Sequence, residues 1–145
     1  MSPEQLFSLV NLLALLGWLL LAALPRQRWP AEVVCGWALP ALLASLYLAI
    51  LAMTWSGHPG GFSSLHEVAR LFEDPWLLLA GWVHYLAFDL FVGGWIVRDA
   101  RARGIRHLFV LPSLVLTFLF GPAGWLSYLA LRAGLRGHVS TGGSA

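Results

Sequence analysis

The sequence predicts an all-α integral membrane protein: a bundle of four transmembrane helices, with a short interfacial helix between the second and the third. Hydrophobic residues make up 59% of the 145 residues and charged residues only 11%, far from the average of soluble domains. The apolar residues gather into four runs, each long enough to cross a bilayer as a helix. The length favours one transmembrane domain over residues 1–136, followed by a disordered Gly/Ser/Thr tail over 137–145.

The first two predicted spans cover residues 6–24 and 33–55. We interpret the first as a retained helix, because its apolar run is longer than that of a signal peptide and no basic residue precedes it. Asn11 is its only internal polar side chain and can form a hydrogen bond with a neighbouring helix. In the second span, Pro40 is expected to kink the helix or to free a carbonyl group.

A glycine- and proline-containing break at 57–61 precedes the predicted interfacial helix. Apolar residues recur at helical spacing from Phe62 to Phe72. The tetrapeptide Ser64-Leu65-His66-Glu67 matches a capping box. Such an amphipathic segment is expected to lie at the membrane surface, over the mouth of the bundle.

The third predicted span, residues 76–97, contains two ionisable side chains, His84 and Asp89. At about 1.5 Å per residue, both lie roughly 12 Å or more from either end of the run. A carboxylate at such a depth costs about 2.5–3.5 kcal/mol on insertion scales. A partner on another helix, a water-filled cavity or protonation of the acid must offset this cost.

On a helix, Tyr85 and Trp82 lie on the same face as Asp89, whereas His84 lies about 140° away from it. His84 and Asp89 therefore do not touch along the helix wall, although they can flank one cavity. The alternative is that Asp89 serves only packing and that His84 is a buried core histidine. Because ionisable groups inside membranes usually mark functional sites, we favour a functional interpretation of the pair.

The fourth predicted span, residues 108–131, contains the dipeptide Gly121-Pro122, which is expected to interrupt the helix near mid-depth. Broken helices occur inside membranes where they line a cavity, so this dipeptide is a second indication of a site. With four spans, the first and third loops hold six arginines and the other side holds three. The positive-inside rule then predicts both termini on the non-cytoplasmic side.

Composition argues against several other classes of protein. The net charge of +2 is too small and too localised to indicate nucleic-acid binding. One cysteine, Cys35, excludes an intrachain disulfide and a cysteine-based metal cluster. The absence of H-x-x-H and E-x-x-H patterns disfavours a di-histidine metal site, so neither metal nor cofactor is expected. Four spans with one buried acid disfavour a transporter unless the chain forms a homo-oligomer, which stays open.

Two motifs carry a resemblance to a known family. They are Gly81-Trp82-x-His84-Tyr85-Leu86-Ala87-Phe88-Asp89 and Thr117-Phe118-x-Phe120-Gly121-Pro122. The sequence resembles the abscisic-acid-deficient-4-like family of integral membrane proteins, whose plant member is associated with neoxanthin synthesis. The resemblance covers about residues 62–132 well, and the first two spans only in hydropathy. The plastid transit segment of the plant proteins is not seen here, which favours a bacterial plasma membrane.

The resemblance implies an isomerase or lyase acting on a carotenoid or another lipophilic terpenoid without a cofactor. Opening an epoxide to an allene needs a base for a carbon-bound proton and an acid for the departing oxygen. His84 and Asp89 are the expected catalytic pair. The expected substrate-binding residues are Trp82, Tyr85, Phe88, Gly121 and Pro122. A non-catalytic membrane module that binds lipid or pigment, or assists a biosynthetic complex, is the alternative.

Overall fold

The computed structural model describes residues 1–55 and 60–140, with side chains up to Leu135. The secondary-structure elements of this part of the chain are all helices and it contains no strand, which confirms the all-α prediction. The elements are α1 (Pro3–Ala23), the π-helical segment η1 (Pro30–Ala38), α2 (Leu39–Thr54), α3 (Leu65–Leu71), α4 (Pro75–Ala102), α5 (His107–Phe120) and α6 (Pro122–Ser140).

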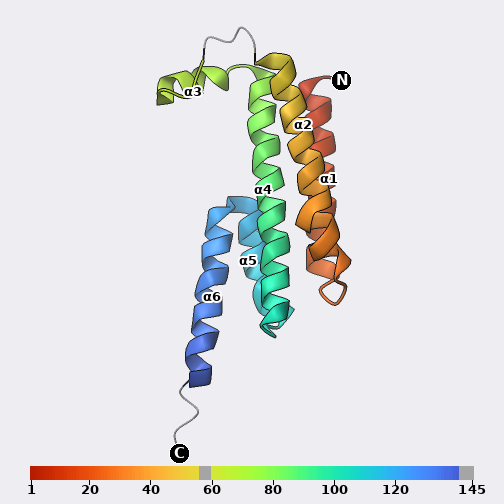
Figure 1. Cartoon of the computed structure of the whole chain (residues 1–145), viewed down its shortest axis with the longest axis vertical. Coiled ribbons are helices and arrows are strands. Elements are labelled where there is room, and N and C mark those ends of the chain that lie inside the picture. Colours follow the sequence, from red (N-terminus) through yellow and green to blue (C-terminus); the bar gives the residue numbers. More distant parts are fainter. Residues whose placement is uncertain (56–59, 141–145) are drawn as a thin grey trace, which may run out of the picture.

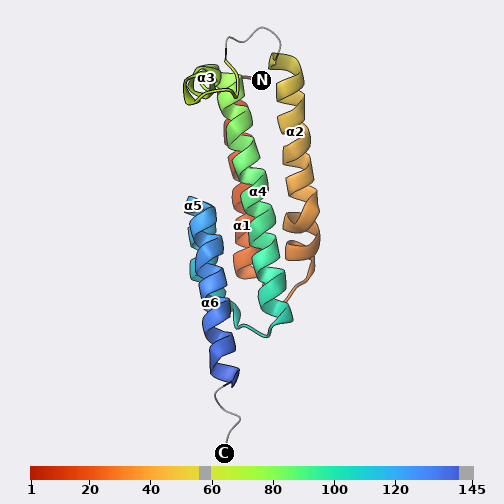
Figure 2. The same cartoon turned by 60° about the vertical axis from the view of Figure 1, so that its left-hand side comes forward.

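Helix α4 is the centre of the fold, and α1, η1, α2, α5 and α6 all pack against it (Figures 1 and 2). The helix begins where the Asp74 carboxylate accepts hydrogen bonds from the Trp76 and Leu77 amides at 2.8 and 3.1 Å. In its most apolar stretch 56% of the residues are buried, against 28% in α1. Gly93 lets Trp18 of α1 approach closely, since a Cβ there would lie 2.7 Å from the indole ring.

Within the described residues, three helical stretches are long and apolar enough to cross a membrane: α1, η1 continued by α2, and α4. They coincide with the predicted spans 6–24, 33–55 and 76–97 within a few residues, except that α4 runs further, to Ala102. The π-helical segment ends just before Pro40, whose missing N–H cannot pair with the carbonyl one turn earlier. Within this segment the carbonyl of Ala31 accepts a hydrogen bond from Arg98 of α4.

The predicted fourth transmembrane helix over 108–131 is corrected to a helical hairpin. Helix α5 has only 14 residues, too few to cross a bilayer. Gly121 ends it with a φ of +43°, a conformation that favours glycine, and α6 returns alongside α5 (Figures 1 and 2). A Cβ on Gly124 would lie 2.0 Å from the Thr117 amide nitrogen, so the two helices approach closely beside the turn.

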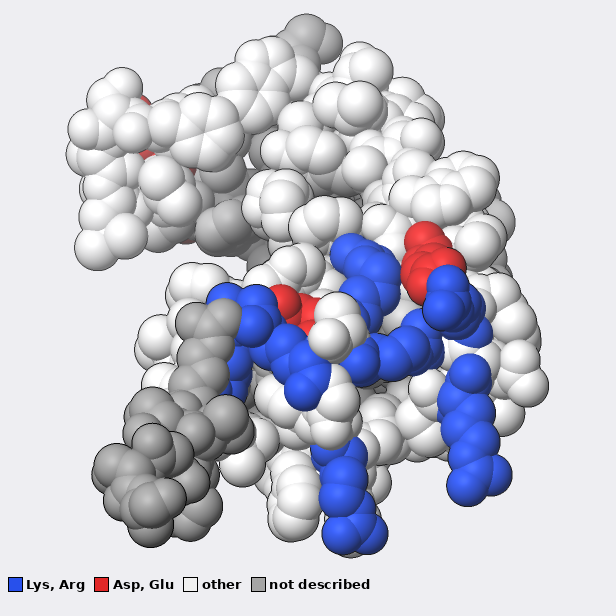
Figure 3. Space-filling view, turned by 60° about the horizontal axis from the view of Figure 1, so that its bottom comes forward, with Lys and Arg blue, Asp and Glu red and all other residues white. Residues whose placement is uncertain are grey.

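The hairpin changes where the ends of the chain lie. The start of α1 and the end of α6 lie at opposite ends of the bundle, whereas four spans would have put both termini on one side (Figure 1). Arginine side chains gather at the end to which α6 returns (Figure 3). They come from the two connecting loops, the end of α4 and α6: Arg26, Arg28, Arg98, Arg101, Arg103, Arg106 and Arg132.

Helix α3 lies at the other end, beside the start of α4 (Figure 1). Its His66 and Arg70 side chains are exposed, as expected for a surface helix. The capping box is only half formed: the Ser64 hydroxyl accepts from the Glu67 amide at 3.2 Å, but the Glu67 carboxylate accepts from Ser63 instead. Part of the predicted break, 56–59, lies outside the described residues. Of the predicted tail 137–145, the first four residues belong to α6 and 141–145 lie outside the described residues.

Candidate functional site

Asp89 lies at the tip of the hairpin, halfway along α4. The residue is 9% exposed, and its Oδ2 atom is buried without a hydrogen-bond partner among the described residues. Its carboxyl group faces Gly121, where an added Cβ would lie 2.8 Å from Oδ1. The missing side chain of Gly121 therefore both permits the turn and leaves room for the carboxyl group beside it. The deep acid and the broken helix, which are separate features of the sequence, lie side by side in the structure.

Tyr85 lies one helical turn before Asp89 and interacts with it electrostatically. Its hydroxyl donates a hydrogen bond of 3.3 Å to the carbonyl of Phe118. That carbonyl belongs to the last turn of α5, whose carbonyl groups lack helical partners. A length of 3.3 Å is long for an O–H···O bond, so the hydroxyl is only weakly held. Tyr85 is thus the polar side chain beside Asp89 that can exchange partners.

Trp82 continues this face of α4 towards the start of the helix. Its indole N–H donates to the Asn11 side-chain oxygen at 3.1 Å, which is the interhelical bond expected of Asn11. The Trp82 ring lies 5.4 Å from Tyr85 and 5.6 Å from Phe7 of α1. Aromatic side chains at these separations attract one another, so they form a continuous wall that ends at Asp89.

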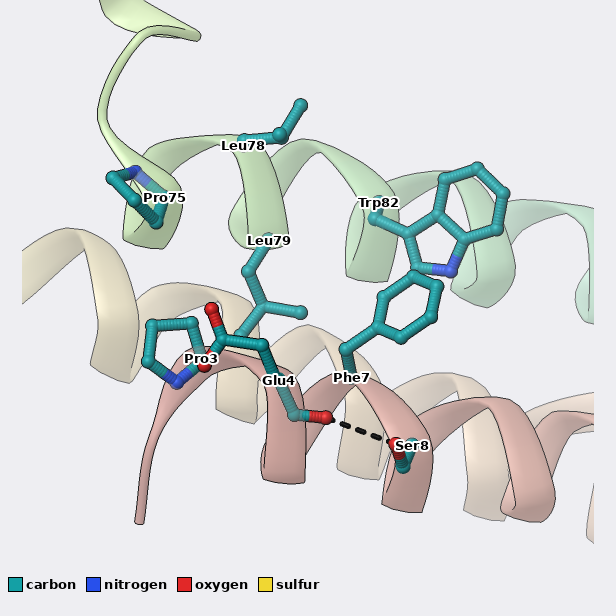
Figure 4. A pocket seen from close by; sticks show the side chains of 8 residues that line it. All are labelled: Pro3, Glu4, Phe7, Ser8, Pro75, Leu78, Leu79 and Trp82. Atoms are coloured by element: carbon teal, nitrogen blue, oxygen red, sulfur yellow. Dashed lines mark hydrogen bonds between the residues drawn. The ribbon is translucent and has the colours of Figure 1, made fainter.

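A groove of about 360 Å³ between α1 and α4 leads to this wall (Figure 4). Phe7 and Trp82 close its inner end, and Pro3 and Pro75 lie at its outer end (Figure 4). Glu4 also lines it, in the first turn of α1. The groove therefore suits an apolar molecule whose inner end lies against Trp82, the neighbour of Tyr85 in the aromatic wall.

His84 and Phe88 lie on a different side of α4. The His84 ring packs 5.5 Å from Tyr47 of α2 and 4.7 Å from Phe88. Phe88 lines a second groove, against Trp37 and Pro40. The predicted set of site residues thus divides: Trp82, Tyr85, Asp89, Gly121 and the adjoining Pro122 come together, whereas His84 and Phe88 do not join them.

Residues outside the predicted site hold the hairpin in position. Asp99 accepts a hydrogen bond from the Tyr128 hydroxyl at 2.6 Å and one from Arg103 at 2.8 Å. Arg132 of α6 lies 3.5 Å from the same carboxylate oxygen. The four-residue spacing of Asp99 and Arg103 is visible in the sequence and indicates an ion pair along one helix. Tyr128 and Arg132, by contrast, reach Asp99 only because the chain reverses at Gly121.

A row of hydrogen-bonded polar side chains between α5 and α6 was not predicted from the sequence either. The Ser127 hydroxyl donates to that of Ser113 at 2.9 Å, and the Thr117 hydroxyl donates to the Ser113 carbonyl at 2.7 Å. These short side chains let α5 and α6 pack closely. Elsewhere in the described chain, no three His, Cys, Asp or Glu side chains come together as metal ligands.

A family model described as ABA DEFICIENT 4-like matches residues 5–128, from the start of α1 to the middle of the returning helix. The chain belongs to the ABA DEFICIENT 4-like family. The match confirms the resemblance and extends it over the first two spans. Comparisons with curated proteins and with solved structures give no match. Its apolar helices and its family identify this ABA DEFICIENT 4-like chain as a carotenoid- or abscisic-acid-related membrane protein.

Proposed function

We propose that this ABA DEFICIENT 4-like protein acts within the membrane on a carotenoid or another lipophilic terpenoid, as an isomerase or related lyase. The observation that carries the proposal is the buried Oδ2 atom of Asp89, which has no partner among the described residues. A buried polar atom left without a hydrogen bond costs about 1–3 kcal/mol. A substrate hydroxyl or an acidic C–H group at the hairpin tip would supply the missing donor.

The groove between α1 and α4 supports a lipophilic substrate. It is lined mainly by apolar side chains, and the ring of Trp82 lies between it and Tyr85. A polyene can lie in this groove with one end against Trp82, and its end group reaches Tyr85 and Asp89 once the Trp82 ring moves aside. Ligand sites usually combine apolar walls with a few convergent polar groups, which is the arrangement here.

Asp89 and Tyr85 can divide the acid and base roles of an epoxide opening. The Asp89 carboxylate takes a carbon-bound proton, the C–O bond breaks, and the Tyr85 hydroxyl protonates the oxygen. Proton transfer from Asp89 to Tyr85 then restores both groups, so substrate and product are isomers. We assign Tyr85 this role rather than His84 because its hydroxyl is beside Asp89, whereas the His84 ring contacts Tyr47.

The test uses the purified protein in lipid nanodiscs with an epoxy-carotenoid. Product is followed by chromatography and mass, and pigment binding by absorption. We expect an isomer of unchanged mass from the wild type, at least a hundredfold slower turnover in Asp89→Asn, and unchanged pigment binding. Glu73→Gln, the same carboxylate-to-amide change at an exposed position, should match the wild type.

Binding without turnover in the wild type would instead support the non-catalytic module, with the same groove as a pigment site. Neither binding nor turnover would reject both functions. Tyr85→Phe separates them further, because loss of one hydroxyl should slow a reaction while leaving the apolar contacts of a bound pigment intact.

A further inference from the structure

A second cavity, of about 290 Å³, lies between α2, α3 and α4. His84, Tyr47, Val68 and Phe72 are among the side chains that line it. None of its lining residues belongs to α1, α5 or α6, and Asp89 is not among them. The cavity is therefore separate from the site at the hairpin tip.

Among the residues that line this cavity, His84 is the one that indicates a ligand. The residue is exposed in the structure, and its ring makes aromatic contacts but no hydrogen bond to any described residue. It lies nine residues after the start of α4, which is about 13 Å along the helix. A neutral imidazole has one donor and one acceptor nitrogen, and neither finds water readily inside a bilayer. A ligand hydroxyl or carbonyl group would supply the partner.

The walls of the cavity favour a ring. Tyr47 meets His84 edge-on at 5.5 Å, and Trp55 stacks on Phe62 at 5.6 Å with 24° between their planes. Phe72 lies on the α3 side and packs closely against Gly81, where a Cβ would lie 2.9 Å from its ring. At about 290 Å³ the space is at the small end of ligand pockets, which suits one ring rather than a long chain.

We propose that this cavity binds a lipid-soluble ring compound, or the ring end of a larger one, whose hydroxyl or carbonyl group forms a hydrogen bond with His84. The inference goes beyond the proposed function and does not depend on it, because the two sites lie on different sides of α4 and share no residue.

The test uses two photoreactive probes in nanodiscs, a diazirine-bearing cyclohexenyl alcohol and its analogue without the hydroxyl group. Crosslinked peptides are identified by mass spectrometry. We expect saturable labelling of α2, α3 and the first half of α4. His84→Phe should weaken binding of the alcohol about fivefold, the factor for one neutral hydrogen bond, and leave the analogue unchanged.

Two substitutions, each of which enlarges a residue that lines the cavity, keep the proposal falsifiable if one of them disturbs the fold. Val68→Trp fills the cavity from α3 and Leu51→Trp fills it from α2, and either should abolish labelling by both probes. Leu48→Trp, an exposed position on α2, is the matched control and should label like the wild type. Size-exclusion chromatography identifies the variants that remain folded.

Labelling that maps to the groove between α1 and α4, or that persists in the folded enlarged variant, would overturn the proposal. An equal loss of both probes in His84→Phe would overturn the assigned hydrogen bond. Asp89→Asn should label normally, so failure at this cavity and failure of the proposed catalytic site give different results.

Discussion

At the scale of single residues, Asp89 and Gly121 depend on each other. The carboxyl group fits at the hairpin tip because the turn residue has no side chain, and the turn forms because glycine accepts a φ of +43°. A deep carboxyl group with an unsatisfied oxygen is costly, and such costs are characteristic of functional sites in membranes. Replacing either residue therefore tests both the fold and the site.

Gly121→Ala should destabilise the protein by about 1–3 kcal/mol, because the added Cβ is strained at this φ and meets the Asp89 carboxyl group. Thermal unfolding in nanodiscs measures the change. Gly134→Ala in α6 is the control: nothing lies within 4 Å of a Cβ there, so stability should be unchanged or slightly higher. Equal stability of Gly121→Ala and the wild type would contradict the turn described here.

At the scale of secondary-structure elements, the hairpin is joined to α4 at both of its ends. Gly121 contacts Asp89 at the tip, and Tyr128 and Arg132 reach Asp99 near the basic end of α4. Two contacts about ten residues apart on α4 fix the tilt of the hairpin, and with it the separation between Gly121 and Asp89. Asp99 and Tyr128 are therefore positioning residues.

Tyr128→Phe should destabilise the protein by about 1.5–3 kcal/mol, because its fully buried hydroxyl makes a 2.6 Å bond to a carboxylate. Arg103→Gln removes a more exposed partner of the same carboxylate and should cost at most about 1 kcal/mol. Unfolding measured in parallel compares the two. The reverse order would show that the hairpin is held by the surface pair rather than by the buried bond.

Helix α3 should lie in the membrane interface on the side opposite the arginines. His66 and Arg70 are exposed. Spin labels at these two positions should be accessible to a water-soluble relaxation agent, but less so than a label in bulk water. A label at Leu86, in the buried part of α4, is the comparison and should be inaccessible. Labels on α3 as protected as that at Leu86 would show that α3 lies within the bundle.

At the scale of the whole molecule, the charge distribution and the hairpin predict one orientation. Among the described side chains, seven arginines belong to the elements at the end to which α6 returns, whereas Arg70 belongs to α3 at the other end. Figure 3 shows the cluster of arginines at the first of these ends. By the positive-inside rule, we expect the arginine-rich end to face the cytoplasm. The chain should then begin outside and α6 should end inside, which revises the orientation expected from four spans.

Reporter fusions placed before α1 and after α6 should report opposite sides of the membrane, and a fusion at Gly104 should report the same side as the one after α6. The reason is that α5 and α6 enter and leave at the same face (Figure 1). A result with both termini on the same side would restore the four-span arrangement and reject the hairpin.

The sequence by itself determined the helical class, the first three spans and the depth of Asp89, because hydropathy and the 3.6-residue period are local properties. The angle between His84 and Asp89 also follows from that period. The partners of each side chain do not, since they depend on which helices pack against each side of α4. Tyr47 beside His84 and Gly121 beside Asp89 were therefore decided by the tertiary structure.

The conformation of the fourth apolar run was likewise decided by the tertiary structure. Gly121-Pro122 indicated a break, but a helix that continues across the membrane and one that turns back contain the same apolar residues, so hydropathy cannot distinguish them. The reversal is selected by contacts between residues distant in the sequence: Gly124 against Thr117, Ser127 with Ser113, and Tyr128 with Asp99. The last two contacts are hydrogen bonds, and they join polar groups of α4, α5 and α6 that a straight helix would hold apart.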